Sequence, residues 1–453
     1  MKLLQFLGLG FLANTSRTNT LTSDSVLLKT IDIPGAAEGT GLKNPQIVRG
    51  PYLQKGSESG IIIRWATDAP VQGKVCYGTT PESLSLILEE TTITCDHKVE
   101  LSGLTPDQKY YYSVGTKERV YEGGTEDYFF MTAPSKDLAP ELVRPMRILV
   151  LGDSGRANDD AALVKDGYLK FTGTRHTDLW LMLGDNAYAT GTFDEYQHAV
   201  FDMYPELLRS SVLWPAIGNH DGESASSLLQ TGPYYELFTL PSCGEVGGVP
   251  SGTAAYYSFD YGNVHFICLD SYGSDRSPDG AMFKWFAQDA ASSDKDWKIA
   301  FWHHPPYTKG SHDSDIETEL IEIRRALPIV EEAGVDIVLS GHSHSYERSY
   351  LIDGHYGFSN SFTSEMKKDG GSGREDESGA YQKRHLAAHE GTVYIVAGTS
   401  GLADNVSPHA AMYTSLSIPG SLVLDVDGKR LDVKFVDYRG EVKDYFTFKK
   451  INK

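Results

Sequence analysis

The second half of this sequence predicts an α/β fold, a β-sandwich with helices on its outer faces, and an all-β sandwich domain precedes it. Two observations support this prediction. Residues 45–134 contain short runs of β-branched and aromatic residues with turn residues between them. From residue 146 to 450, apolar runs of four or five residues alternate with helical stretches, as expected for strands buried on both faces. We therefore predict two domains with these boundaries, joined by a proline-containing linker at 137–145.

In the first domain, strands are expected at 61–65, 73–77 and 110–114. The segment Leu104–Tyr112 resembles the tyrosine-corner strand of a fibronectin type III-like sandwich, and Trp65 lies on an earlier strand. This domain carries no cluster of catalytic side chains. We expect it to act as a scaffold or a lid, with an independent ligand-binding module as the alternative.

In the second domain, the helix expected at 316–333 places five apolar residues at helical spacing, which predicts a core-facing side. Residues 353–390 are rich in glycine, serine and charge, and we interpret them as an irregular insertion at the rim of a site. A strand at 393–396 and a hairpin at 422–429 complete the sheets. The other expected strands are 148–151, 179–183, 212–214, 298–302 and 335–339, the other helices are 159–171, 194–209 and 280–291, and the five apolar residues are Ile316, Leu320, Ile323, Leu327 and Val330.

The net charge and the N-terminal segment indicate which classes of function are expected and which are not. The chain has 61 acidic and 41 basic residues among 453, a net charge of −20, which argues against binding nucleic acid or anionic membranes. Lys2 and the apolar stretch 3–13 indicate a candidate signal peptide in residues 1–20, hence a secreted or periplasmic protein; an ordinary disordered start is the alternative. No run is long enough to span a membrane.

The four cysteines have no metal-binding or disulfide spacing. Cys268 lies in an apolar run and is expected on a buried strand. A bond between Cys76 and Cys95 stays open at this point, and so does the redox compartment.

Five short polar clusters stand where predicted strands end, and they supply aspartate, tyrosine, asparagine and histidine side chains. Each cluster alone is compatible with an ordinary turn. Functional groups of open α/β sheets gather beyond the carboxyl ends of strands, so five such clusters in order indicate one site. These donor types suit a pair of hard or borderline cations, a common arrangement for cleaving phosphate esters. The clusters are Gly152–Gly155, Gly184–Tyr188, Gly218–Asp221, His303–Pro305 and Gly341–His344.

The motifs GDSG, GDNAY, GNHD, HHP and GHSHSYER resemble those of the purple acid phosphatases, which are calcineurin-like metallophosphoesterases. The resemblance covers residues 45–450 and implies a metallophosphoesterase sandwich behind a fibronectin-like domain. One departure is Asp221, where plant-like members usually have glutamate. We expect little consequence, because that residue is not a metal ligand in the family.

The resemblance implies an acid phosphatase that hydrolyses phosphate monoesters with metal-bound hydroxide, using Fe(III) and a divalent metal (Zn, Mn or Fe(II)). Within His303–Pro305 the family pattern favours His303 as the ligand, with His304 as the alternative. The purple colour of the family comes from tyrosinate-to-iron(III) charge transfer, here at Tyr188. The implied ligands are Asp153, Tyr188, His344 and the bridging Asp185 for Fe(III), and Asp185, Asn219, His303 and His342 for the divalent metal.

Two further histidines, His220 and His312, are expected to bind phosphate oxygens or protonate the leaving alcohol. Residues 346–348 are expected to support the site from outside the ligand set. A metallophosphodiesterase or nucleotide-hydrolysing enzyme on the same metal frame is one alternative, and a non-catalytic binding protein is another. The expected partner is a small phosphate ester; the oligomeric state stays open, with a homodimer as one option.

Overall fold

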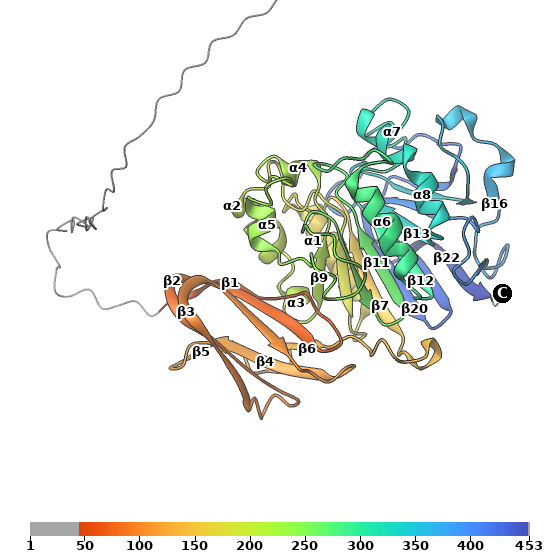
Figure 1. Ribbon diagram of the computed structural model, residues 1–453. Helices are drawn as coiled ribbons and strands as arrows, with labels where there is room; N and C mark the ends of the chain where they lie inside the picture. Colours follow the sequence, from red (N-terminus) through yellow and green to blue (C-terminus); the bar gives the residue numbers. More distant parts are fainter. Residues whose placement is uncertain (1–44, 452–453) are drawn as a thin grey trace, which may run out of the picture. The chain divides into compact units, whose positions relative to one another are not determined.

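Six strands form the N-terminal domain in the computed structural model, which describes residues 45–451 (Figure 1). The strand segments predicted at 61–65 and 73–77 are parts of one long strand, β2, whose first half pairs with β1 and whose second half pairs with β4. The strands are β1 (Ile47–Gln54), β2 (Gly60–Gly78), β3 (Leu86–Ser102), β4 (Lys109–Gly115), β5 (Val120–Gly123) and β6 (Phe129–Met131).

The tyrosine corner predicted for this domain is present. The backbone N–H of Thr105 donates to the hydroxyl of Tyr110 at 3.1 Å, and Trp65 is fully buried against the ring of His97. The domain is hydrogen-bonded to the rest of the chain through buried tyrosines: the Tyr52 hydroxyl donates to the carbonyl of Leu237 at 2.9 Å. Such contacts to backbone agree with a scaffold role for this domain.

Two seven-stranded mixed sheets make up the second domain, and helices lie on their outer faces (Figure 1). The apolar side chains between the sheets form the main core; Trp214 of β9 stacks on Phe259 of β10 with ring centroids 3.8 Å apart. The parallel strands are β7 (Met146–Leu151), β8 (Leu179–Met182) and β9 (Val212–Pro215) in one sheet, and β11 (Val264–Cys268), β12 (Trp297–Phe301), β13 (Ile337–Ser340) and β18 (Val393–Ala397) in the other.

Antiparallel strands extend both sheets, and the predicted hairpin at 422–429 is present, with Gly428 at φ 52° in its turn. Cys268 is buried on β11, as predicted, and Cys76 and Cys95 are free. The antiparallel strands are β10 (Tyr257–Tyr261), β14 (Tyr346–Ser349) and β19 (Met412–Leu416) in the sheet of β11, and β20 (Gly420–Asp427), β21 (Arg430–Asp437) and β22 (Val442–Ile451) in the sheet of β7. The edge strand β17 (Tyr381–Arg384) pairs in parallel with β22.

Helices α1 (Asp159–Thr172) and α6 (Ala281–Ser292) follow the prediction, but two predicted helices are interrupted. The stretch 194–209 divides into α2 (Phe193–Tyr196), a π-helical turn at Gln197–Phe201 and α3 (Pro205–Leu208). The stretch 316–333 divides into α7 (Thr318–Arg325) and α8 (Leu327–Glu332). Pro205 and Pro328 lack an amide hydrogen and begin new helices rather than continuing old ones. Ile316 lies before α7 and is 74% exposed, so its predicted core position is wrong.

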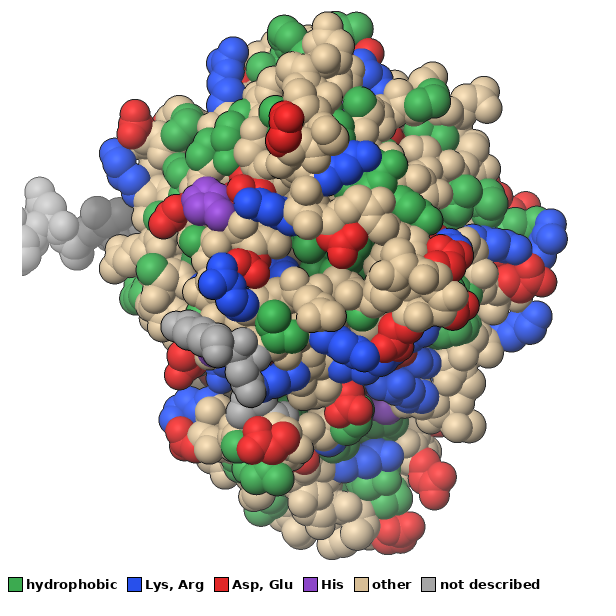
Figure 2. Space-filling view, turned by 90° about the vertical axis from the view of Figure 1, so that its right-hand side faces the viewer, with side chains coloured by type: hydrophobic (Ala, Val, Ile, Leu, Met, Phe, Trp, Pro, Cys, Tyr) green, Lys and Arg blue, Asp and Glu red, His purple; other side chains and the backbone are tan. Residues whose placement is uncertain are grey.

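The predicted insertion at 353–390 is mostly irregular, as expected, with two short helical turns, β17 and a small strand β16 (Lys367–Asp369) that pairs with β15 (Leu351–Ile352). Within residues 45–451, no helix combines the length and apolar character needed to cross a membrane. The candidate signal peptide lies outside the described residues. Acidic and basic side chains are interspersed over the face shown in Figure 2.

Candidate metal centre

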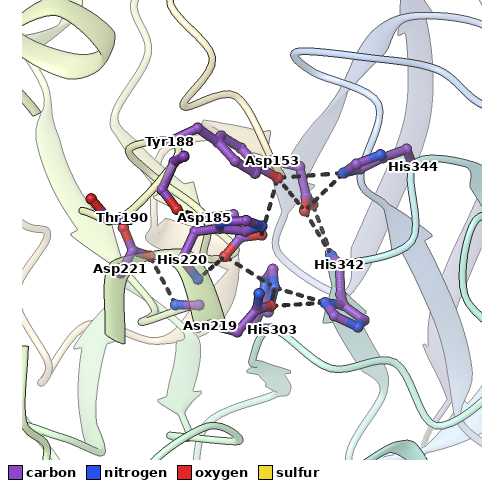
Figure 3. A network of polar contacts seen from close by, with 12 residues as sticks. Asp153, Asp185, Tyr188, Thr190, Asn219, His220, Asp221, His303, His342 and His344 are labelled. Carbon is purple, nitrogen blue, oxygen red and sulfur yellow. Dashed lines mark hydrogen bonds and ion pairs between the residues drawn. The ribbon is translucent and has the colours of Figure 1, made fainter. Parts of the chain in front are cut away.

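The five polar clusters meet at the carboxyl ends of parallel strands from both sheets (Figure 3). Asp153 follows β7 and Asp185 follows β8, while Asn219 begins the short helix α4 (Asn219–Gly222) after β9. From the other sheet, His303 follows β12, and the histidines of Gly341–His344 follow β13. Residues that are far apart in sequence therefore share one edge, as the strand-end pattern predicts.

The backbone at three of these positions is in the left-handed region, which non-glycine residues rarely adopt. The φ angles are 56° at Asp153, 52° at Asp185 and 66° at His342. Each residue directly follows a glycine at the end of a strand. Conformations of this kind persist where the surrounding structure fixes them, and they cluster at functional sites.

Two of the motif glycines are required because side chains of the site occupy the space beside them. A Cβ atom on Gly218 would lie 2.2 Å from Oδ1 of Asp185. A Cβ atom on Gly341 would lie 2.4 Å from Oδ2 of Asp153. The glycines thus let neighbouring strand ends approach closely enough for their side chains to share a site.

One half of the centre is built around the Tyr188 hydroxyl. This oxygen lies 3.2 Å from Oδ1 of Asp153, 3.0 Å from Oδ2 of Asp185 and 3.4 Å from Nε2 of His344. Phenolate and carboxylate oxygens are hard anionic donors, which suit a trivalent cation.

The other half is built around Asn219. Its Oδ1 lies 3.0 Å from Nε2 of His303 and 3.0 Å from Nδ1 of His342, and these two nitrogens are 3.2 Å apart. The Oδ1 of Asp185 is 3.3 Å from Nε2 of His303. One carboxylate therefore faces both halves of the centre, which is the arrangement that a bridging ligand needs.

The electrostatics fit a site for cations. Burial and the nearby charge of Asp185 raise the pKa of Asp153, although His303 opposes this. Burial also raises the pKa of the Tyr188 phenol strongly, as do the charges of the two aspartates. Burial lowers the pKa of His342 to about 4, so this ring is neutral and has a lone pair to offer. Ligand atoms of Asp153, Asp185 and His303 all lie within 4.8 Å of one another, and cations between them would offset these unfavourable charges.

Each of the three expected histidine ligands has a partner on its outward nitrogen. His303 donates from Nδ1 to the carbonyl of Leu183 at 2.9 Å, and His344 donates from Nδ1 to Asp404 at 3.0 Å. Nε2 of His342 lies 3.6 Å from Glu317. Such partners fix the tautomer and orientation of a metal-binding imidazole. The sequence analysis did not identify Glu317 or Asp404, because neither belongs to a recognisable motif.

His304, the alternative to His303, is also buried near the site. Its Nδ1 is hydrogen-bonded to the Ser271 hydroxyl at 2.9 Å, and its ring is 4.5 Å from that of His342. His303 points Nε2 at Asn219 and Asp185, which His304 does not do. This geometry supports His303 as the ligand.

The two histidines expected to assist the chemistry flank the centre. His220 binds the carbonyl of Ala189 through Nδ1 at 2.6 Å, and its Nε2 lies 3.9 Å from Oδ2 of Asp185. The ring of His312 packs 3.8 Å from that of His342, and its Nδ1 is 2.9 Å from Glu317. Both side chains are about one-third exposed and therefore accessible to a substrate.

Asp221 has a larger structural role than the sequence analysis expected. Its buried carboxylate accepts hydrogen bonds from the Gly218 and Asn186 backbones at 2.8 and 3.1 Å and from the Tyr196 hydroxyl at 2.6 Å. Burial, followed by the charge of Asp185, raises its pKa to about 6. These bonds tie the loops that carry Asp185 and Asn219 to each other. The signal was available, since Asp221 belongs to the third polar cluster.

Residues 346–348 support the site only from a distance. Arg348 and Tyr346 bind the buried carboxylate of Asp444, at 2.6 and 2.7 Å, on the far side of β14. Glu347 accepts from the Thr308 hydroxyl, in the loop that follows His303. These residues therefore hold strand and loop positions, as expected for an outer layer.

Both domains of the chain are similar to known proteins. Residues 146–346 match the family described as calcineurin-like phosphoesterase, and residues 49–132 match the purple acid phosphatase N-terminal domain. The chain is 29% identical to purple acid phosphatase 23 of Arabidopsis thaliana over 283 residues, covering 56% of this chain and 58% of that protein. It is 29% identical to purple acid phosphatase 15 of the same plant over 285 residues, covering 56% and 50%.

The fold also matches a solved structure, the purple acid phosphatase PPD1 from yellow lupin (Lupinus luteus) seeds. The TM-score is 0.65 with 16% sequence identity, and the match covers 88% of this chain and 74% of that chain. The chain spans about half to three-fifths of the length of the two curated relatives named above. Along the chain, the purple acid phosphatase N-terminal domain comes first and the calcineurin-like phosphoesterase domain follows it. The chain belongs to the purple acid phosphatases, within the calcineurin-like phosphoesterases.

Proposed function

We propose that this protein is an acid phosphatase that hydrolyses small phosphate monoesters at a dinuclear metal centre. The observation that carries the proposal is the convergence of seven donor side chains from five separate strand ends, with the Asp185 carboxylate facing both halves. A loop network without a ligand would not be expected to gather two buried carboxylates, a phenol and three imidazoles around a common centre.

Asp153, Tyr188, His344 and Asp185 would hold Fe(III), and Asp185, Asn219, His303 and His342 would hold a divalent ion (Zn, Mn or Fe(II)). The division follows donor chemistry, because the first set is rich in anionic oxygen and the second in neutral nitrogen and amide oxygen. When bound, the two metals would activate a water molecule for attack on phosphorus and bind a phosphate oxygen. A net positive centre of about +2 would attract a phosphate dianion to an otherwise acidic protein.

His220 and His312 would handle the substrate beside the metals. His220 is fixed by its bond to Ala189, so its Nε2 is left to contact a phosphate oxygen or the leaving group. His312 is fixed in the same way by Glu317. Either side chain would donate a proton to the leaving alkoxide as a general acid, and we place the pH optimum in the acidic range.

The same proposal covers the location of the enzyme, its substrate class and its assembly. The apolar stretch after Lys2 supports a secreted or periplasmic enzyme, and the net charge of −20 supports a small phosphate ester rather than nucleic acid as the partner. A homodimer stays one option for its assembly.

The test is hydrolysis of p-nitrophenyl phosphate and of bis(p-nitrophenyl) phosphate by the purified protein at pH 4 to 8, before and after removal of metal. We expect the monoester to be the better substrate, with the faster rates at the acidic end and no turnover after metal removal. Faster cleavage of the diester would favour the phosphodiesterase alternative. Activity that survives complete metal removal would overturn the dinuclear mechanism.

A further inference from the structure

Arg156 is an exposed arginine directly after the first polar cluster, in the loop between β7 and α1. Its guanidinium carbon lies 4.5 Å from the centroid of the Tyr188 ring. Within residues 45–451, no hydrogen bond or ion pair is found for its guanidinium group. Arg156 is therefore a cation at the edge of the metal centre with its donors still available.

The position of Arg156 distinguishes it from the other cations near the site. Its charge acts on both Tyr188 and His344, which places it beside the half of the centre that Tyr188 organises. It contacts the ring of Tyr188 but forms no ion pair with Asp153 or Asp185, so it lies beside the ligands and not among them. Lys309, by contrast, is already paired with Asp315 at 3.0 Å.

The protein has a net charge of −20, and an unpaired arginine beside its proposed phosphate-binding centre is suited to bind an anion. Guanidinium groups bind phosphate through two parallel hydrogen bonds, and their charge is fixed at any working pH. The scissile phosphate would lie over the metals. A second phosphate joined to it would extend beyond the metal ligands, and Arg156 lies against one of those ligands, Tyr188.

We propose that Arg156 forms an anion subsite that binds the second phosphate of diphosphate substrates, such as inorganic pyrophosphate. This proposal rests on the proposed phosphatase function and narrows its substrate class. In the reaction, the oxygen of water bonds to one phosphorus and the bond from that phosphorus to the bridging oxygen breaks. The bridging oxygen leaves on the second phosphate, and the two protons of the water are shared between the two product phosphates.

The test compares kcat/KM for pyrophosphate and for p-nitrophenyl phosphate in the wild type, Arg156→Ala and Arg156→Lys. We expect Arg156→Ala to lower kcat/KM for pyrophosphate by about 10- to 100-fold more than for p-nitrophenyl phosphate, because a charged hydrogen-bond pair is lost. Lysine should restore part of this loss, since it retains the charge without the planar fork. Metal content should stay unchanged in both variants.

A matched control is Arg119→Ala in the N-terminal domain. Arg119 is also exposed and lies 5.5 Å from a tyrosine ring, that of Tyr121, but it is far from the metal centre in the fold. This variant should leave both substrates unaffected.

Equal losses on the two substrates, no loss on either, or a loss of metal from Arg156→Ala would each overturn the assignment. If the wild type hydrolyses neither compound, the proposed phosphatase function fails. Equilibrium binding of pyrophosphate then decides the subsite separately. Weaker binding in Arg156→Ala than in the wild type would support it, and equal binding would reject it.

Discussion

Two buried polar regions of the second domain can be compared directly. One surrounds Asp336, which is fully buried just before β13. Its Oδ1 lies 2.9 Å from the ammonium of Lys383 and 2.6 Å from that of Lys450, while its Oδ2 accepts from the backbone of Lys298 at 3.0 Å. The ammonium groups of Lys383 and Lys450 thus share one carboxylate as their counter-charge.

The metal centre, a short distance along the same strand, has the opposite character. Two buried carboxylates of like charge, Asp153 and Asp185, share one site, and the nitrogens of His303 and His342 face each other at 3.2 Å. The two regions show how a structural ion-pair cluster differs from a ligand site. Charges of opposite sign in direct contact hold the fold together, whereas several donors that all suit a cation indicate a ligand site.

Removal of the shared carboxylate should have the largest effect. We expect Asp185→Asn to reduce phosphatase turnover to background and to lower the metal content, because one side chain faces both halves of the centre. Turnover and metal analysis of the purified variant measure this. Asp159→Asn, an exposed aspartate on α1, is the matched control and should keep both properties. A fully active and fully metallated Asp185→Asn would remove the bridging assignment.

The outer partners of the histidines should matter less. We expect Asp404→Asn and Glu317→Gln each to lower metal affinity or kcat by about 10- to 100-fold, because they orient His344 and His342. Titration of metal-free protein with Fe(III) measures the affinity for Asp404→Asn, and titration with the divalent ion measures it for Glu317→Gln. Wild-type affinity and kcat in both variants would show that the centre does not depend on these carboxylates.

A substitution in the ion-paired cluster around Asp336 should change the stability of the protein and leave its metal binding unchanged. We expect Asp336→Asn to destabilise the folded state by about 3–5 kcal/mol, because two buried ammonium groups lose their counter-charge. Urea unfolding measures the change. The folded fraction of this variant should bind metal in the wild-type amount, and a selective loss of metal would break the distinction between the two regions.

The smallest predicted effect concerns pH. His265 is buried between Asp260 and Asp289, with its ring nitrogens 2.7 and 2.9 Å from their carboxylates. Burial alone would lower the pKa of His265, but the two hydrogen bonds raise it to about 9. Because this pKa is raised on folding, the stabilisation is complete below about pH 6.5 and is lost as the pH rises through about 9.

Relative to His265→Gln, the wild type should therefore lose up to about 3 kcal/mol of stability between pH 6.5 and 9. Chemical unfolding of both proteins across this pH range is the measurement. Parallel pH profiles would contradict the charged state assigned to His265.

The sequence could predict the strands and their polar ends because both depend on local pattern. An apolar run followed by a glycine and a ligand-type residue, as at Gly152 and Asp153, is contained in a few neighbouring residues. The helix interruptions at Pro205 and Pro328 are local features as well, because proline does not continue a helix, but the predicted helices 194–209 and 316–333 ran through both positions. The contacts of Glu317 and Asp404 could not be predicted, because they depend on how separate loops pack over the strand ends.

Metal content and the visible spectrum of the purified protein test the central claim most directly. We expect two metal ions per chain, one of them iron, and absorption in the middle of the visible range. Tyr188→Phe should lose this absorption with a smaller loss of activity than Asp185→Asn, because its phenol oxygen contacts one half of the centre only. A protein with one metal ion or none that still cleaves phosphate esters, or an unchanged spectrum in Tyr188→Phe, would contradict the account.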